Sequence, residues 1–307
     1  MKDQSLLEDL KVYDLEEHKA FLCSKKKAKN VEDLPERGYC DEKLAEENEQ
    51  ETVILASFVR SGNSLSRGIL ERLTGLITGS DCPLFVKLVK DLEEMGFNGE
   101  GLLDKRCWIV KTHFPEAPAG EGFYADKVLL VVRNPIDSIV SAFNMTCTGT
   151  HDKSMSKEDF ERYREEWEKH SYIEFTVWVD FYEFYFNSKI PFHIIRFEDI
   201  LNDTRNTYLG IMQFLLNKKN LAGTVAEKII DLMDTGGKAP EVYKPRQGKI
   251  NANRELFKQE DIDKFYGIGK EVIDKLGYTE IFTGVKQENE REFVVKSNAE
   301  NLEKAIN

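Results

Sequence analysis

The feature that most constrains this 307-residue chain is an apolar run followed directly by a short polar loop. Residues 53–58 (VILASF) are apolar or small and begin with two β-branched residues, which predicts a buried strand of the parallel type. The loop RSGNS follows at 60–64, and from Leu65 onward apolar residues recur at helical spacing. The segment therefore predicts a strand, a tight loop and a helix that is capped by an Asn or Ser of the loop.

The chemistry of this loop favours the binding of an anion. A loop before a helix directs several backbone N–H groups and the positive end of the helix dipole toward one point. Gly62 allows close approach of the backbone, Arg60 adds a charge, and Ser61 and Ser64 add hydroxyl groups. An ordinary strand-to-helix turn is the alternative. A Walker A loop is excluded, because the glycine-to-serine distance is too short and no lysine precedes Ser64.

Composition narrows the function classes further. The net charge of −12 argues against nucleic-acid binding, because a nucleic-acid binder needs a basic footprint. No apolar run reaches the length that spans a membrane, and the acidic first ten residues do not fit a signal peptide. Five cysteines without metal-ligand spacing predict reduced thiols in the cytoplasm. In a truncated ectodomain of the secretory lumen, Cys23 and Cys40 would be the first pair to suspect.

Three further segments are expected to be strands, at 107–113, 127–132 and 191–197. The first ends in Lys111, Thr112 and His113, and the second is followed by Arg133 and a helical stripe that contains Ser141. Open parallel sheets bind ligands at the carboxyl ends of their strands, where these side chains would gather.

Strands that alternate with helices predict an α/β fold, a single P-loop-type domain with a central parallel sheet and helices on both faces. We assign 51–280 to this domain, 1–50 to a charged N-terminal extension and 281–307 to a polar C-terminal tail. Residues 78–105 are expected to form a loop-rich insertion with one short helix. A long aromatic-rich helix is expected over 159–187, with further helices over 204–216, 225–233 and 260–276.

Taken together, the RSGNS loop, the Lys-Thr-His segment and the later Arg-Asn-Pro-x-Asp-x-x-x-Ser motif resemble those of sulfotransferases. These enzymes use 3′-phosphoadenosine 5′-phosphosulfate (PAPS) and release adenosine 3′,5′-bisphosphate (PAP), without a metal. The resemblance implies that Arg133 and Ser141 contact the 3′-phosphate. It implies that His113 is the base, that Lys111 holds the sulfuryl oxygens and that Arg60 stabilises the leaving phosphate. The residues implied at the 5′ end are Arg60, Ser61, Gly62, Asn63 and Ser64.

A basic segment at 244–254 resembles the family's Arg-Lys-Gly loop, which folds over the 3′-phosphate. Arg246 and Gly248 match that loop, whereas Gln247 replaces its lysine, and Lys249 is a candidate to restore the charge. Two other departures are Phe197 in place of a tyrosine and Leu65 in place of a tryptophan that contacts adenine in several relatives.

Two other functions stay open at this stage. A P-loop nucleotide kinase shares the strand–loop–helix order but requires a lysine in the loop, and a non-catalytic protein would keep only the nucleotide pocket. The acceptor can be a small molecule, a carbohydrate or a protein, because no motif identifies it. The oligomeric state is open too.

Overall fold

The computed structural model describes residues 15–25, 51–82, 87–103, 107–115, 125–235 and 253–307. Its centre is a five-stranded sheet in the order β2-β3-β1-β4-β5, and every adjacent pair of strands is parallel. The strands are β1 (Val53–Ser57), β2 (Thr78–Ser80), β3 (Ile109–Thr112), β4 (Lys127–Val132) and β5 (Phe192–Arg196). The predicted parallel sheet is thus confirmed.

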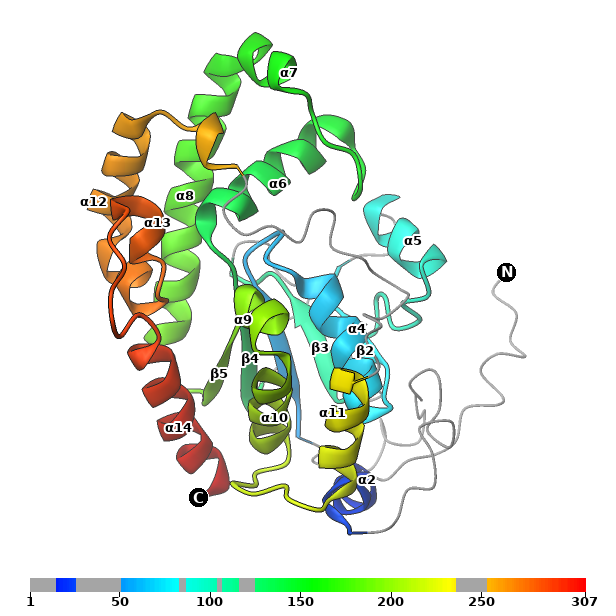
Figure 1. The fold of residues 1–307 in the computed structure, drawn as a ribbon. Coiled ribbons are helices and arrows are strands. Elements are labelled where there is room, and N and C mark those ends of the chain that lie inside the picture. The colour runs from blue at the N-terminus through cyan, green and yellow to red at the C-terminus, as the bar shows by residue number, and fades with distance from the viewer. Residues whose placement is uncertain (1–14, 26–50, 83–86, 104–106, 116–124, 236–252) are drawn as a thin grey trace.

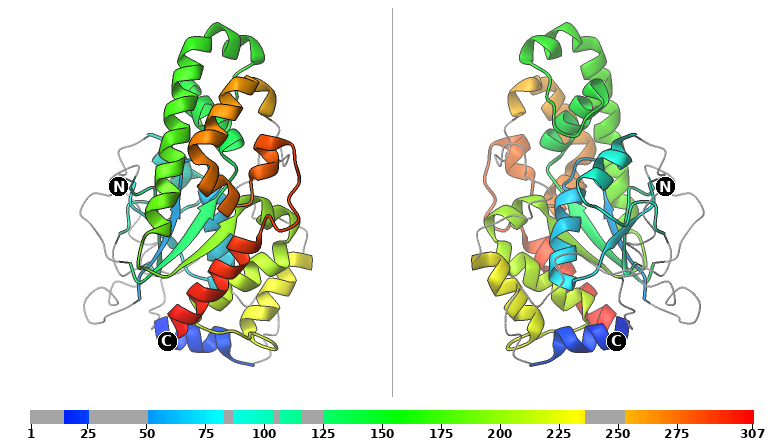
Figure 2. Two further views of the ribbon diagram at one scale, coloured as in Figure 1. Left: turned by 90° about the vertical axis from the view of Figure 1, so that its left-hand side faces the viewer. Right: turned by 90° about the vertical axis from the view of Figure 1, so that its right-hand side faces the viewer.

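Helices cover both faces of this sheet (Figure 1, Figure 2). Successive side chains of a strand point to opposite faces, and both central strands are buried along their whole length. Ile54 and Leu130 join an apolar cluster with helices α6 (Pro135–Thr148), α8 (Arg164–Phe186) and α12 (Gln259–Lys275). Leu55 and Leu129 join a second cluster with α2 (Leu15–Cys23), α4 (Asn63–Thr74), α10 (Thr204–Leu215) and α11 (Val225–Thr235). The near-continuous apolar runs of the sequence therefore correspond to strands that are buried by helices on both faces of the sheet.

The insertion at 78–105 contains one strand that the sequence did not predict. β2 is only three residues long (Thr-Gly-Ser) and lies at the edge of the sheet beside β3. A side chain at Gly79 would come within 2.3 Å of the Leu102 carbonyl oxygen, so only glycine fits there. Because β2 is short and contains a glycine, it shows no pattern of apolar residues that would predict a strand. The short helix expected in this insertion is α5 (Lys87–Glu94).

A buried charged network holds this insertion to the domain. The Arg67 guanidinium on α4 forms an ion pair with Glu100 and donates to the Thr78 hydroxyl at 2.8 Å and to the Thr78 carbonyl at 2.9 Å. Both charged side chains are almost fully buried, so each charge depends on the other for compensation.

The expected helix over 159–187 is divided at Tyr163 into α7 (Lys157–Arg162) and α8. Ser156 begins α7 with a capping box formed with Asp159. Trp167 and Trp178 of this aromatic-rich segment lie on α8 and are fully buried. Further short helices are α9 (Phe197–Asn202), α13 (Thr279–Thr283) and the 3₁₀ helix η2 (Arg254–Leu256).

Part of the C-terminal tail forms a helix, α14 (Glu292–Ile306), that lies along the outer strand β5 (Figure 2). The Asn298 side chain accepts a hydrogen bond from the Ile194 N–H at 2.7 Å and donates one to the Ile194 carbonyl at 2.9 Å. Asn301 accepts from the Phe192 N–H. These amides take the place of a neighbouring strand, so α14 satisfies the exposed edge of the sheet.

Candidate functional site

The loop after β1 has an unusual backbone. Arg60 and Gly62 both have positive φ angles, of 62° and 102°. A side chain at Gly62 would lie 2.5 Å from a ring carbon of Phe197, so this position requires glycine for both conformation and space. The predicted tight loop is thus present but shorter than expected, because α4 begins at Asn63, inside the segment 60–64.

The predicted Asn or Ser cap is wrong, because Gly62 occupies the N-cap position of α4 and no described side chain caps the helix. The Asn63 side chain instead turns back to β1, where it donates to the Ser57 hydroxyl at 3.0 Å and the Leu55 carbonyl at 3.4 Å. A helix start without a side-chain cap leaves backbone N–H groups available to an anion.

The two loop serines differ in their surroundings. The Ser61 hydroxyl is fully buried at 3.4 Å from the Tyr182 hydroxyl, which itself donates to the Val131 carbonyl. Ser61 thus faces the core in this structure, and Tyr182 contacts the loop from the core side. Ser64 is half-buried in the first turn of α4. Of the two hydroxyls, that of Ser64 is the one with solvent access.

The structure brings the first loop and the start of α6 together. The Arg60 Nε atom donates to the Ser141 hydroxyl at 3.0 Å, and Arg133 donates to the Arg60 carbonyl at 3.2 Å. The Arg133 guanidinium lies over the Phe197 ring at 4.5 Å, and its buried Nε atom has no partner in the described part of the chain. Arg60 is more than 70 positions from both Arg133 and Ser141 in sequence, yet the three residues form one cationic cluster in an acidic protein.

Arg60 has a further partner, His151, that no sequence motif indicated. Its guanidinium donates to the His151 carbonyl at 3.0 Å and to the His151 Nδ1 atom at 3.1 Å. Since an arginine only donates, His151 accepts at Nδ1 and is neutral in this arrangement. His151 follows α6 as an isolated residue, and no spacing links it to the loop at 60–64.

His113 lies just beyond β3 with its ring orientation fixed. Its Nδ1 atom is 2.7 Å from the Ser57 carbonyl oxygen, which can only accept, so Nδ1 carries the proton and Nε2 keeps a free lone pair. Burial, and then the positive charge of Lys111, lower the pKa of His113 to about 3, against a weaker opposing effect of the Ser57 hydrogen bond. The imidazole is therefore neutral near pH 7, as a general base must be. Arg60 also lowers the pKa of His113, so the loop after β1 and the histidine share one electrostatic environment.

Lys111 is buried, and its ammonium group donates to the Cys82 sulfur at 2.7 Å. Asp81 beside it accepts from the Thr112 hydroxyl, and burial raises the pKa of Asp81. Neither Asp81 nor Cys82 was predicted to belong to the site, because they precede β3 by almost 30 residues in a segment without a motif. The lysine lies close to His113 but is held by residues of the insertion.

A hydrogen-bond network fixes the start of α6. The Asn134 side chain caps the helix by accepting from the Asp137 N–H, and Glu198 accepts from the backbone and side chain of Asn134 at 3.1 and 3.0 Å. The Tyr278 hydroxyl donates to the other Glu198 oxygen at 2.8 Å. This network positions Arg133, which directly precedes the cap.

The candidate residues Arg246, Gln247, Gly248 and Lys249 lie outside the described residues. The next residue described after them, Asn253, donates to Asp137 in the first turn of α6 at 2.8 Å. The basic segment thus ends beside the helix that carries Ser141.

Two features are absent from the residues that the structure describes. No group of three or more His, Cys, Asp or Glu side chains is arranged there to hold a metal ion. Among the same residues, no helix has the length and apolar character needed to cross a bilayer.

Comparison with known proteins bears on the same region. Residues 92–235 match the family model described as the sulfotransferase domain. This match covers slightly less than half of the chain. The matched residues extend from α5 to α11 and include Lys111, His113, Arg133 and Ser141. The loop at 60–64 precedes the matched residues.

Three curated proteins that are similar to this chain come from insects. A WSCD family member of Aedes aegypti and one of Drosophila melanogaster are each 36% identical, over 33% and 31% of this chain. A third, from Drosophila pseudoobscura pseudoobscura, is 27% identical over 52% of this chain. The matches cover 30%, 28% and 49% of those relatives, so this chain corresponds to less than half of each.

Among solved structures, mouse sulfotransferase SULT7A1 complexed with PAP matches 74% of this chain and 84% of its own. The TM-score is 0.44, and the sequence identity is 16%.

The contact between Gly62 and Phe197 leads to a prediction. Gly62→Ala should lower the free energy of unfolding by about 1–3 kcal/mol, because alanine is strained at this φ and its Cβ would meet the Phe197 ring. The substitution should also weaken PAP binding, because it displaces the loop before α4. Urea unfolding and calorimetry measure both effects.

Gly284→Ala is the matched control, since Gly284 has a φ of 69° but no atom within 4 Å of the added Cβ. It should lose only the smaller conformational part of the stability and keep its PAP affinity. If the two variants behave alike, contact with Phe197 has no role in shaping the loop.

Proposed function

We propose that this chain transfers the sulfuryl group of PAPS to a hydroxyl or amine acceptor, by in-line displacement with His113 as the base. The observation that carries the proposal is the cluster of Arg60, Arg133 and Ser141, at an edge of the sheet where His113 keeps a free Nε2 atom. The two phosphate groups of PAPS each require cations, and this cluster supplies two arginines in a chain of net charge −12.

Each end of the donor has its own set of residues in this proposal. Backbone N–H groups at the uncapped start of α4, with the Ser64 hydroxyl, receive the 5′-phosphosulfate. Arg133 and Ser141 receive the 3′-phosphate, to which the resemblance to the family's basic loop also assigns Arg246. Because Arg60 now donates to Ser141 and His151, donor binding requires Arg60 to exchange these partners for phosphate oxygens.

The chemical step balances without a metal. The acceptor oxygen or nitrogen attacks sulfur, the bond between sulfur and the bridging phosphate oxygen breaks, and His113 takes the acceptor proton at Nε2. Negative charge grows on the leaving phosphate, where Arg60 stabilises it, and Lys111 holds the sulfuryl oxygens. In-line placement and neutralisation of spread charge are the same provisions that phosphoryl transfer needs.

Ligand preference tests the proposal against a nucleotide kinase. In calorimetry without added metal, we expect PAP to bind and ATP to bind at least about tenfold more weakly, a difference of about 1.4 kcal/mol. The physical reason is that Arg133 and Ser141 pair with a 3′-phosphate that ATP lacks.

The measurement is repeated with Mg²⁺ and with adenosine 5′-monophosphate, which lacks the 3′-phosphate but is otherwise matched to PAP. Mg²⁺ should leave PAP affinity nearly unchanged. Equal affinity for PAP and the monophosphate, or an ATP preference that depends on Mg²⁺, would contradict the proposal.

A further inference from the structure

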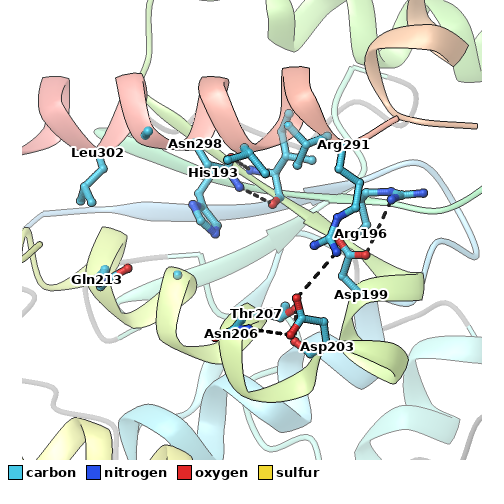
Figure 3. A pocket seen from close by; sticks show the side chains of 15 residues that line it. His193, Arg196, Asp199, Asp203, Asn206, Thr207, Gln213, Arg291, Asn298 and Leu302 are labelled. Carbon is cyan, nitrogen blue, oxygen red and sulfur yellow. Dashed lines mark hydrogen bonds and ion pairs between the residues drawn. The ribbon is translucent and has the colours of Figure 1, made fainter. Parts of the chain in front are cut away.

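A separate groove lies between strand β5 and helices α10 and α14 (Figure 3). Its cavity volume is about 360 Å³, within the range of about 300–1,000 Å³ that is typical of small-molecule sites. His193, Gly210 and Asn298 line it, and none of the residues of the proposed sulfuryl-transfer site does. The groove is thus a cavity for which the proposed reaction has no use.

His193 is the unusual residue of this groove. Its side chain is only 7% exposed and stacks on the Phe214 ring at a centroid distance of 5.5 Å. Neither ring nitrogen hydrogen bonds to another residue in the described part of the chain, and Nδ1 is shielded from solvent. Burial lowers the pKa of His193 to about 4, so the ring is neutral near pH 7. A buried imidazole without a partner carries a cost that a bound hydrogen-bonding group would remove.

Gly210 adjoins the free edge of this ring. A Cβ atom at position 210 would come within 3.1 Å of the His193 Cε1 atom and 3.2 Å of Nε2. The missing side chain leaves room beside the polar edge of the ring, and Gly210 itself lines the groove.

The rest of the groove indicates what kind of molecule fits. Ile194, Val294 and Leu302 supply aliphatic surface. At one end, Asp199 pairs with Arg291 at 2.8 Å and with Arg196 at 3.7 Å, and Asp203 pairs with Arg291 at 3.7 Å (Figure 3). Two cations and two anions balance one another, so the groove offers no net charge to an ion. The Asn298 amide is occupied by the backbone of Ile194.

We propose that this groove binds a small uncharged molecule with an apolar body and a hydroxyl group that hydrogen bonds to His193. A hydroxyl both donates and accepts, so it pairs with either tautomer of the neutral ring. The apolar body packs against Ile194 and the exposed side of α14. The site is independent of the proposed sulfuryl transfer, because it shares no residue with it.

Benzyl alcohol and toluene are suitable probes, because they differ by the hydroxymethyl group in place of a methyl. In NMR of the full chain with ¹⁵N- and ¹³C-labelled histidine, benzyl alcohol should shift the His193 ring signals in a saturable manner. Its affinity should exceed that of toluene by about two- to tenfold, the effect of one net hydrogen bond. The shifts should persist in the His113→Ala variant, whether or not the chain transfers sulfuryl groups.

Two variants complete the test, with binding followed through the α14 backbone amide signals of uniformly ¹⁵N-labelled protein. His193→Phe keeps a ring against Phe214 but removes the nitrogen, so it should bind benzyl alcohol no more tightly than toluene. Ala299→Trp changes an exposed position on the groove wall and should block both probes while the protein stays folded. Absence of a saturable shift, an unchanged preference in His193→Phe, or equal binding in Ala299→Trp would overturn the proposal.

Discussion

His113→Ala is expected to reduce sulfuryl transfer by about 100- to 10,000-fold while PAP affinity stays nearly unchanged. The Nε2 lone pair is available because Nδ1 donates to the Ser57 carbonyl, and the ring is neutral at pH 7 because burial and Lys111 lower its pKa to about 3. The nucleotide phosphates are assigned to other residues, so binding survives. Turnover with labelled PAPS and calorimetry with PAP measure the two effects.

His113→Asn is the matched variant for this test. An asparagine amide can still donate toward the Ser57 carbonyl, so the end of β3 keeps its hydrogen bond, but it cannot accept the acceptor proton. Both variants should therefore lose turnover to a similar extent. If His113→Asn retains most of the wild-type rate, the histidine serves to hold β3 against β1, and another group is the base.

Arg133→Ala is expected to weaken PAP binding by about 2–5 kcal/mol, which corresponds to about 30- to 5,000-fold in the dissociation constant. Its guanidinium lies over Phe197 beside the Arg60 carbonyl, and its Nε atom is buried without a described partner. Removing the Arg133 guanidinium leaves the 3′-phosphate of PAP without the main cation that neutralises it. Folding should survive, because Arg133 follows the end of β4 and does not belong to either apolar cluster.

Two further substitutions serve as comparisons for the effect of Arg133→Ala on PAP binding. Ser141→Ala removes one neutral hydrogen bond and should cost PAP binding only about 0.5–1.5 kcal/mol. Arg162→Ala removes an arginine that lies over Tyr163, in the short helix α7, and should leave affinity unchanged. Equal losses for Arg133 and Arg162 would mean that only the overall charge of the protein matters.

The fold was predictable where burial leaves a pattern in the chain. The strands at 53–57 and 127–132 are covered on both faces, so nearly all of their residues are apolar. β2 was missed because its three residues include the glycine that lets it approach Leu102. The role of α14 at the sheet edge depends on Asn298 and Asn301, and polar side chains that replace a strand have no periodic signature.

The candidate site likewise contains residues whose proximity could be predicted from the sequence and residues whose proximity could not. Arg60, His113, Arg133 and Ser141 follow strand ends or a helix start, where topology brings separate segments to one edge, so their proximity could be expected. Contacts made by loops and insertions could not, which is why His151, Cys82 and Asp81 were found only in three dimensions. The direction of Ser61 toward Tyr182 likewise depends on packing across more than 100 residues of sequence.

Incubation with ³⁵S-labelled PAPS and a panel of hydroxyl and amine acceptors tests the central claim most directly. The account predicts that at least one acceptor yields a labelled product, with one PAP released per label transferred. It also predicts that this product forms without added metal and is lost in His113→Ala. If wild-type protein binds PAP but labels no acceptor of the panel above the background seen with His113→Ala, sulfuryl transfer at this site is contradicted, and a non-catalytic nucleotide-binding protein becomes the better account.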